Sequence, residues 1–187
     1  TISTNFARYR NHFYDPVNNR GLTATAFGVI RIRGERAPDW ALEDQEEFFT
    51  QAFSYRDARL AFLTALIAGA PLDRETALAS TFEILGHVIH PLQDMASPPH
   101  TRNDIHGGFG FGPTSLFERY LDQEQVRPRL NFGGTPVRLD LPRHYWTTGD
   151  GRGLAEFVNR NFVSEGTNFT TRVEGAIGGG YPNPVLR

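Results

Sequence analysis

One stretch of twenty residues constrains this chain more than any other. Residues 87–106 hold four of the six histidines together with two aspartates and an asparagine, and Pro98 and Pro99 interrupt them. Neutral imidazole and ionised carboxylate are ligands that zinc and similar divalent cations bind. A connector interrupted by proline lets ligands from a helix and from the following loop converge on one point. The stretch therefore predicts a metal site near a helix end.

Helical spacing places three of these side chains on one face. His87, His90 and Asp94 are separated by three and four residues, so in a helix all three project from the same side. A single histidine and aspartate four residues apart is more often an exposed pair than a set of metal ligands. Spacing alone therefore leaves both interpretations open. The added signal is His100, which follows the proline break and can turn back toward the same face.

The middle of the chain is expected to be helical. Apolar residues at helical spacing predict five helices, the third of them capped by Asp73. Residues 129–150 are interrupted by Pro, Gly and Asp and predict a loop with one hairpin at most. We therefore expect an all-α bundle of five or six helices, with irregular loop or hairpin additions after residue 125 and a metal-lined cleft near the middle of the helices. The predicted helices cover residues 43–54, 56–68, 73–90, 115–125 and 154–160.

Composition narrows the remaining choices. The 187 residues, 39% of them hydrophobic, suffice for one domain with a core, so we expect a single domain over residues 1–187. A net charge of -2 gives no basic field, and an anionic substrate must be held by a local site. The absence of Cys excludes disulfides and thiolate ligands. No apolar run could span a bilayer, and no signal peptide or initial Met is present, so we expect part of a longer polypeptide.

Two motifs resemble a known family. HPLQDMASPPHTRN, residues 90–103, closely resembles the signature of bacterial zinc-dependent phospholipase C, in which a His is followed by Asp, Pro, His and Asn at fixed positions. HFYDP, residues 12–16, resembles a second motif of the same enzymes and occurs in the same order. SLFERYLD, residues 115–122, is similar to a later helix of the family, and residues 159–167 are similar to a stretch of larger relatives. The S1/P1 nucleases share the helical fold and these ligands, so the resemblance extends to the whole superfamily.

The resemblance implies a zinc cluster. His12, His90 and Asp94 would bind one zinc, with Asp94 bridging to a second, while His100 and Glu118 would hold a third. Clustered zinc ions activate water and neutralise phosphate oxygens. The implied reaction is phosphodiester hydrolysis, with phospholipase C-type cleavage of a phospholipid head group as the leading form. Relatives of this kind are usually exported, so a secreted or periplasmic location is expected.

Several residues depart from the family pattern or fall outside it. Thr114 stands where the family has a histidine four residues before the glutamate, and His106 is either its substitute or a solvated loop residue. His87 is expected beside the ligands or in the core, and His144 is expected to be exposed or packed. Asn103 either orients a ligand or loop by hydrogen bonding or caps a turn.

The HFYDP segment also carries expectations for the fold. Phe13 and Tyr14 are expected to pack, and Asp15 with Pro16 to form a turn. In the family a catalytic aspartate precedes this segment by about a dozen residues, and the mature N-terminus with a nearby histidine completes the second zinc site. Only 11 residues precede His12 here, and none is acidic. The general base is therefore expected upstream of Thr1, in an N-terminal segment of the same protein.

Three functions stay open on the sequence. The first is a zinc phosphodiesterase of phospholipase C type. The second is a single-strand nuclease of S1/P1 type, in which an aromatic cluster could contact bases instead of acyl chains. The third is a non-catalytic module that zinc only stabilises. The aromatic cluster consists of Phe109, Phe111 and Phe117.

Overall fold

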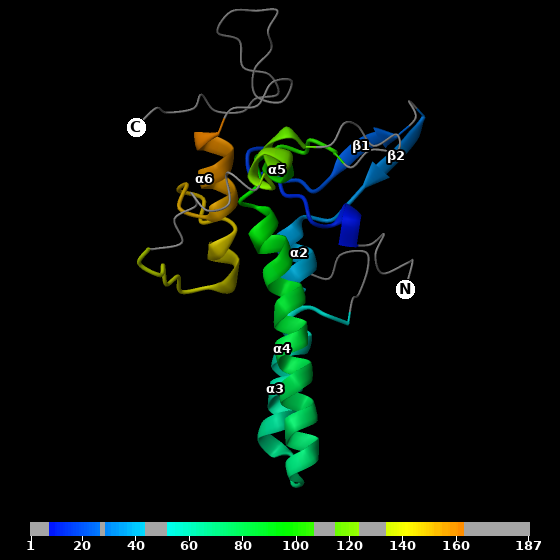
Figure 1. Ribbon diagram of the computed structural model, residues 1–187, viewed down its shortest axis with the longest axis vertical. Helices are drawn as coiled ribbons and strands as arrows, with labels where there is room; N and C mark the ends of the chain where they lie inside the picture. The colour runs from blue at the N-terminus through cyan, green and yellow to red at the C-terminus, as the bar shows by residue number, and fades with distance from the viewer. Residues whose placement is uncertain (1–7, 27–28, 44–51, 107–114, 124–133, 163–187) are drawn as a thin grey trace, which may run out of the picture.

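The computed structural model describes residues 8–26, 29–43, 52–106, 115–123 and 134–162. They are mostly helical and include one small sheet (Figure 1), so the expected all-α class holds apart from that sheet. Within the described ranges, no helix combines the length and the apolar character needed to cross a membrane. The elements are β1 (Thr23–Ala26), β2 (Ile30–Arg33), α2 (Ala37–Leu42), α3 (Tyr55–Ile67), α4 (Pro71–Asp94), the 3-10 helix η1 (Pro98–Thr101), α5 (Leu116–Leu121), the 3-10 helix η3 (Pro142–Tyr145) and α6 (Leu154–Asn161).

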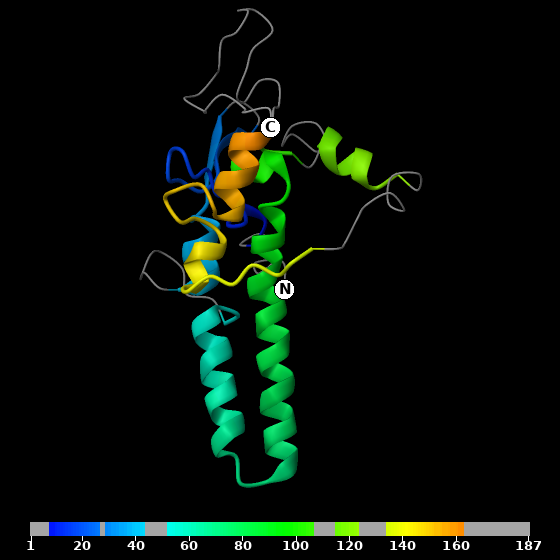
Figure 2. The ribbon, with the colours of Figure 1, turned by 90° about the vertical axis from the view of Figure 1, so that its left-hand side faces the viewer.

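Helices α3 and α4 form a long antiparallel hairpin that extends away from the other described elements (Figure 2). A capping box starts α3, because the Ser54 hydroxyl accepts from the backbone of Asp57 and the Asp57 carboxylate accepts from the backbone of Ser54. The prediction that Asp73 caps the next helix is wrong. Helix α4 begins two residues earlier, with Pro71 in its first turn, where the fixed φ of proline suits a helix and its missing donor is not needed.

Helix α4 brings the predicted ligands to its C-terminal end. It continues through Pro91 and ends at Asp94, and η1 follows after a three-residue break. The ligands were expected near the middle of the helices, but they lie where α4 ends and the chain turns. Figure 1 shows that α5, α6 and the β-hairpin gather around this same end of α4.

Sequence patterns did not predict the β-hairpin of β1 and β2. Its strands pair antiparallel with Thr23 opposite Arg33, and Ile32 is buried against Phe13 and Leu22. The hairpin was expected later, within residues 129–150, but the part of that range from residue 134 onward contains η3 and no strand. The irregular structure predicted after residue 125 therefore holds for residues 134–153, without a hairpin among them.

The helix predicted over residues 43–54 is corrected at both ends. Glu43 ends α2 in the left-handed conformation, with φ at 46°, instead of starting a helix. Residues 52–54 are bends that lead into α3. The remainder of that prediction, residues 44–51, lies outside the described residues, as do Phe109, Phe111 and Thr114.

The HFYDP segment sits between two hydrophobic clusters. Phe13 is buried with Leu22 and Ile32, whereas Tyr14 belongs to the cluster that joins α2, α4 and α6. The Asp15 carboxylate accepts from the backbone amides two and three residues later and closes a turn. Packing for the two aromatic residues and a turn at Asp15 agree with the sequence prediction.

Candidate metal centre

The structure brings all six predicted ligands together in two groups of three. His12, His90 and Asp94 form the first group, and His100, His106 and Glu118 form the second. In each group every residue offers one ligand atom, and those atoms lie within 4.8 Å of one another. Each group therefore contains two imidazoles and one carboxylate and could hold a metal ion.

The first group has distances that suit a tetrahedral ion. His12 Nδ1 lies 3.3 Å from Asp94 Oδ2, and His90 Nε2 lies 3.4 Å from the same oxygen. Ligand atoms at about 2.0–2.2 Å from a common tetrahedral zinc are roughly 3.3–3.5 Å apart. His90 and Asp94 come from one face of α4, as their spacing predicts. His12 is the first residue of the HFYDP segment and precedes the turn at Asp15.

Two polar atoms of the first group are buried. Asp94 Oδ2 is out of contact with solvent and lies beside the two imidazole nitrogens, whereas His12 Nε2 is buried without a hydrogen-bond partner. A buried polar atom without a partner is costly, and a cation shared with the carboxylate oxygen would remove part of that cost. Burial alone would raise the pKa of the Asp94 carboxyl, but the surrounding imidazoles, with the His12 contact first among them, lower it below its ordinary value. The carboxylate is therefore in the ionised form that a metal requires.

The second group joins the loop after η1 to helix α5. His106 Nε2 lies 3.0 Å from Glu118 Oε1, and His100 Nε2 lies 4.0 Å from the same atom. Ser115 caps α5 by accepting from the Glu118 backbone, and the Ser97 hydroxyl donates to Glu118 Oε1 at 3.2 Å. These two serines hold the only carboxylate of the group in place.

Backbone carbonyls set the tautomers of both histidines in the second group. His100 Nδ1 lies 3.1 Å from the Asp94 carbonyl, and His106 Nδ1 lies 2.9 Å from the Asp104 carbonyl. Because a carbonyl oxygen only accepts, each Nδ1 must carry the proton and donate it. Nε2 is then the atom available to a cation, which is the arrangement that orients metal-binding histidines. Burial, reinforced by neighbouring His12, lowers the pKa of His100 to about 3, so this ring is neutral at physiological pH.

The two groups are neighbours. The ring centroids of His12 and His100 are 4.6 Å apart, and those of His100 and His106 are 4.7 Å apart. Phe13 packs its ring against all three imidazoles and closes the inner side of the centre. On the outer side, His90 and Glu118 remain partly exposed. The arrangement can therefore place two cations side by side, with solvent access from one side.

Asn103 has a structural role that its motif position did not specify. Its side chain donates to the Thr23 carbonyl at 2.9 Å and accepts from the Thr23 amide at 2.5 Å. It therefore fixes the loop that carries His100 and His106 to the start of β1. Asn103 itself has φ at 57°, a left-handed conformation that Asn tolerates better than most residues.

The remaining two histidines lie outside both groups. The Arg8 guanidinium donates a hydrogen bond to His87 Nδ1, 2.8 Å away, and the His87 ring packs on Phe53. Burial, together with the charge of Arg8, lowers the pKa of His87. His144 is half-buried in η3. The placement of His144 agrees with the prediction, whereas His87 is half-buried and contacts Arg8 and Phe53 rather than a residue of either ligand group.

Sequence reasoning missed the buried polar residues that support the loop. Arg102 is fully buried and donates to the Asn159 carbonyl at 2.9 Å. The Asn159 side chain in turn donates to the Thr101 carbonyl at 2.7 Å. Helix α6 thereby anchors the residues that follow His100. Asn159 lies in the segment that resembles larger relatives, which was the only sequence signal for this contact.

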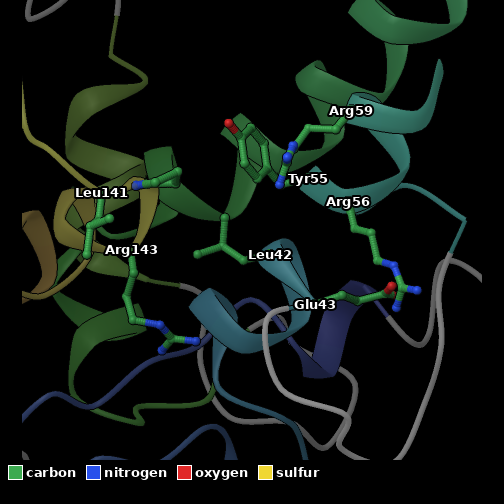
Figure 3. A pocket seen from close by; sticks show the side chains of 8 residues that line it. Leu42, Glu43, Tyr55, Arg56, Arg59, Leu141 and Arg143 are labelled. Carbon is green, nitrogen blue, oxygen red and sulfur yellow. The ribbon is translucent and has the colours of Figure 1, made fainter. Parts of the chain in front are cut away.

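A separate cavity of about 530 Å³ lies between α2, the start of α3 and η3. It contains none of the six ligand residues. Figure 3 shows its three arginine side chains arranged around Leu42. Of these, Arg143 is paired with the buried carboxylate of Asp39 at 2.5 Å. The lining residues are Leu42, Glu43, Tyr55, Arg56, Arg59, Leu141, Pro142 and Arg143.

Comparison with protein-family models, with curated proteins and with solved structures gives no match to this chain. The geometry of the two ligand groups and the motifs that encode them are therefore the basis for assigning a function.

Proposed function

We propose that this chain is the metal-binding part of a zinc-dependent phosphodiesterase that cleaves a phospholipid head group in the manner of a phospholipase C. The observation that supports it is the pair of adjacent ligand groups, each with two imidazoles and one carboxylate, centred on the neighbouring rings of His12 and His100. Two cations side by side are the arrangement that enzymes use to neutralise a phosphate diester.

The chain's own residues would divide the work as follows. His12, His90 and Asp94 would hold one zinc ion, and the second group would hold another. Zinc bound there would supply Lewis-acid activation of the phosphate diester and of water. The carbonyls of Asp94 and Asp104 accept from Nδ1 of the two imidazoles in the second group, so that each Nε2 faces Glu118.

Access and water exclusion also follow from the contacts. Phe13 seals the inner side of the centre, so a substrate phosphate would approach from the side where His90 and Glu118 are exposed. The preference for a phospholipid over a nucleic acid depends on the two motifs that resemble phospholipase C. A secreted or periplasmic location is part of the same proposal.

The test combines metal content with hydrolysis. The chain, and the longer polypeptide with any residues encoded upstream of Thr1, are assayed with phosphatidylcholine vesicles, a soluble chromogenic phosphocholine diester and single-stranded DNA. We expect zinc-dependent release of the head group, lost with chelator and restored by zinc. His90→Ala and His100→Ala should abolish it, whereas His144→Ala, outside both groups, should leave it unchanged.

Three results would count against the proposal. Hydrolysis that survives complete removal of zinc contradicts it. Cleavage of DNA with no lipid turnover favours the S1/P1-type nuclease. Unfolding on chelation, with no phosphodiester hydrolysed by the longer polypeptide, favours the module that zinc only stabilises.

A further inference from the structure

The sides of α3 that do not pack on α4 expose several large apolar residues. Ala58 and Ala65 are the buried residues of α3, seven positions apart on the side that packs on α4. Five large apolar residues on the remaining sides are between 46% and 74% exposed. They are Leu60, Phe62, Leu63, Leu66 and Ile67.

The exposed residues repeat at the spacing of a helix-packing seam. Residues spaced three or four positions apart share one face of a helix. On α3 this spacing links positions 56, 59, 60, 63, 66 and 67. We call this the outer face of α3, defined as Arg56, Arg59, Leu60, Leu63, Leu66 and Ile67. A helix that is apolar on its core side and again on its outer side normally has neighbours on both.

The size of this surface is more than half of what one side of a stable interface needs. Taking about 200 Å² for each fully exposed large side chain, the four apolar residues of the outer face leave roughly 500 Å² in contact with solvent. That is within the range for the largest patch on a typical monomer, about 300–600 Å², and over half of the roughly 800 Å² that each partner contributes to a standard interface. Helix α4 is different, because its exposed Leu72, Phe82 and Ile89 are ten and seven positions apart, and Glu75 and Glu83 occur between them in the sequence.

We propose that the outer face of α3 binds the same face of a second copy of this chain, with the two α3 helices antiparallel and a two-fold axis close to Leu63. A self-complementary contact needs a face without like charges at its centre, because each residue near the axis meets its own copy. No charged residue occurs from Leu60 to Leu72, so the centre and the hairpin tip meet this condition.

The charges at the two ends of the face determine the direction. Arg56 and Arg59 lie at the start of α3, where they line the cavity shared with α2 and η3, and both are exposed. A parallel pair of α3 helices would bring these arginines against their own copies, which costs free energy. In the antiparallel pair they lie instead beside the partner's hairpin tip, where the start of α4 exposes Asp73 and Glu75 together with Arg74, a net charge of about -1 that favours the two arginines. Antiparallel helices also place opposite ends of their dipoles together.

The first test is the association state of the full chain. By sedimentation velocity, wild-type protein is expected to shift from the 21.0 kDa monomer to a dimer of twice that mass within about 1–100 µM, the weak end for interfaces of this size. Leu63→Glu with Leu66→Glu should weaken the dimer at least about 100-fold, since each removes a large buried side chain from the centre. Phe82→Glu, at a residue that is even more exposed but lies on α4, should leave association unchanged. Circular dichroism should show unaltered helix content for every variant, because these side chains are exposed.

The second test measures whether the two α3 helices are antiparallel. Because this chain has no cysteine, each introduced cysteine is the only one that can form a disulfide. Leu63→Cys should form an intermolecular disulfide with glutathione disulfide as oxidant, because it lies next to its own copy. Phe82→Cys should not. Arg59→Cys and Ile67→Cys should each crosslink poorly alone but efficiently when mixed, because in one chain they lie about 12 Å apart along the helix and only the antiparallel pair brings them together.

The outcomes separate the alternatives. A chain that stays monomeric over the whole range overturns the proposal, as does a dimer that tolerates both glutamates. Association lost equally with Phe82→Glu would indicate nonspecific clustering and also overturns it. Self-crosslinking of Arg59→Cys alone would overturn the antiparallel direction.

Discussion

Replacing His106 with alanine should lower the zinc content of this chain from two ions to one. His106 Nε2 lies 3.0 Å from Glu118 Oε1, and without it the second group keeps only His100 and Glu118 as ligands. Loss of a residue that merely hydrogen-bonds a ligand weakens metal binding by about 10–100-fold. Loss of a ligand itself should therefore weaken it by more than about 100-fold, or roughly 2.7 kcal/mol.

The measurement is zinc per chain by mass spectrometry, after dialysis against a weak competing chelator. His90→Ala should also retain one ion, because it damages only the first group, and the double variant should retain none. His144→Ala is the matched control and should retain two. If His106→Ala keeps both ions, or if His144→Ala loses one, the assignment of His106 in place of Thr114 is wrong.

Three further predictions concern stability. Asp39→Asn should destabilise the chain by about 3–5 kcal/mol in urea unfolding, since it leaves two arginines beside a neutral amide in a buried site. Asn103→Ala should lower the free energy of unfolding by about 1–2 kcal/mol, because two hydrogen bonds to Thr23 are lost. Asn103→Gly, which tolerates the positive φ, should lower it by about as much, because it loses the same two bonds. Because burial and neighbouring His12 lower the pKa of His100 to about 3 from 6.5, the unfolded chain gains a proton first as the pH falls. Metal-free protein should therefore lose up to roughly 4–5 kcal/mol between pH 6.5 and pH 3, and His100→Gln should flatten that pH profile.

Local signals in the sequence predicted the elements that depend on local physics. Helix α3 follows from its apolar spacing, although its capping Ser54 was assigned to the preceding predicted helix, and α6 follows from a helical run after Gly153. Helix α2 was not predicted, because its six residues are all buried and it depends on packing rather than on a pattern of its own. The β-hairpin was missed although residues 30–33 alternate Ile and Arg with the period of a strand, and of these two isoleucines only Ile32 is buried.

The candidate site was predictable only in part for a related reason. Helical spacing alone places His90 beside Asp94, but nothing local brings His12 there from 78 positions away along the chain. That contact was predicted from the resemblance of HFYDP to a family motif. The partner of Asn103, Thr23, could not be predicted, because the bond joins a loop to a strand that the sequence analysis missed.

The most direct test of the metal centre is a crystal of the zinc-loaded chain measured on both sides of the zinc absorption edge. We expect one anomalous peak among His12, His90 and Asp94, and a second among His100, His106 and Glu118, each at about 2.0–2.2 Å from its nitrogen and oxygen ligands. Density without either peak, with imidazolium and carboxylate groups paired directly, would contradict a two-cation centre and the hydrolysis proposed for it.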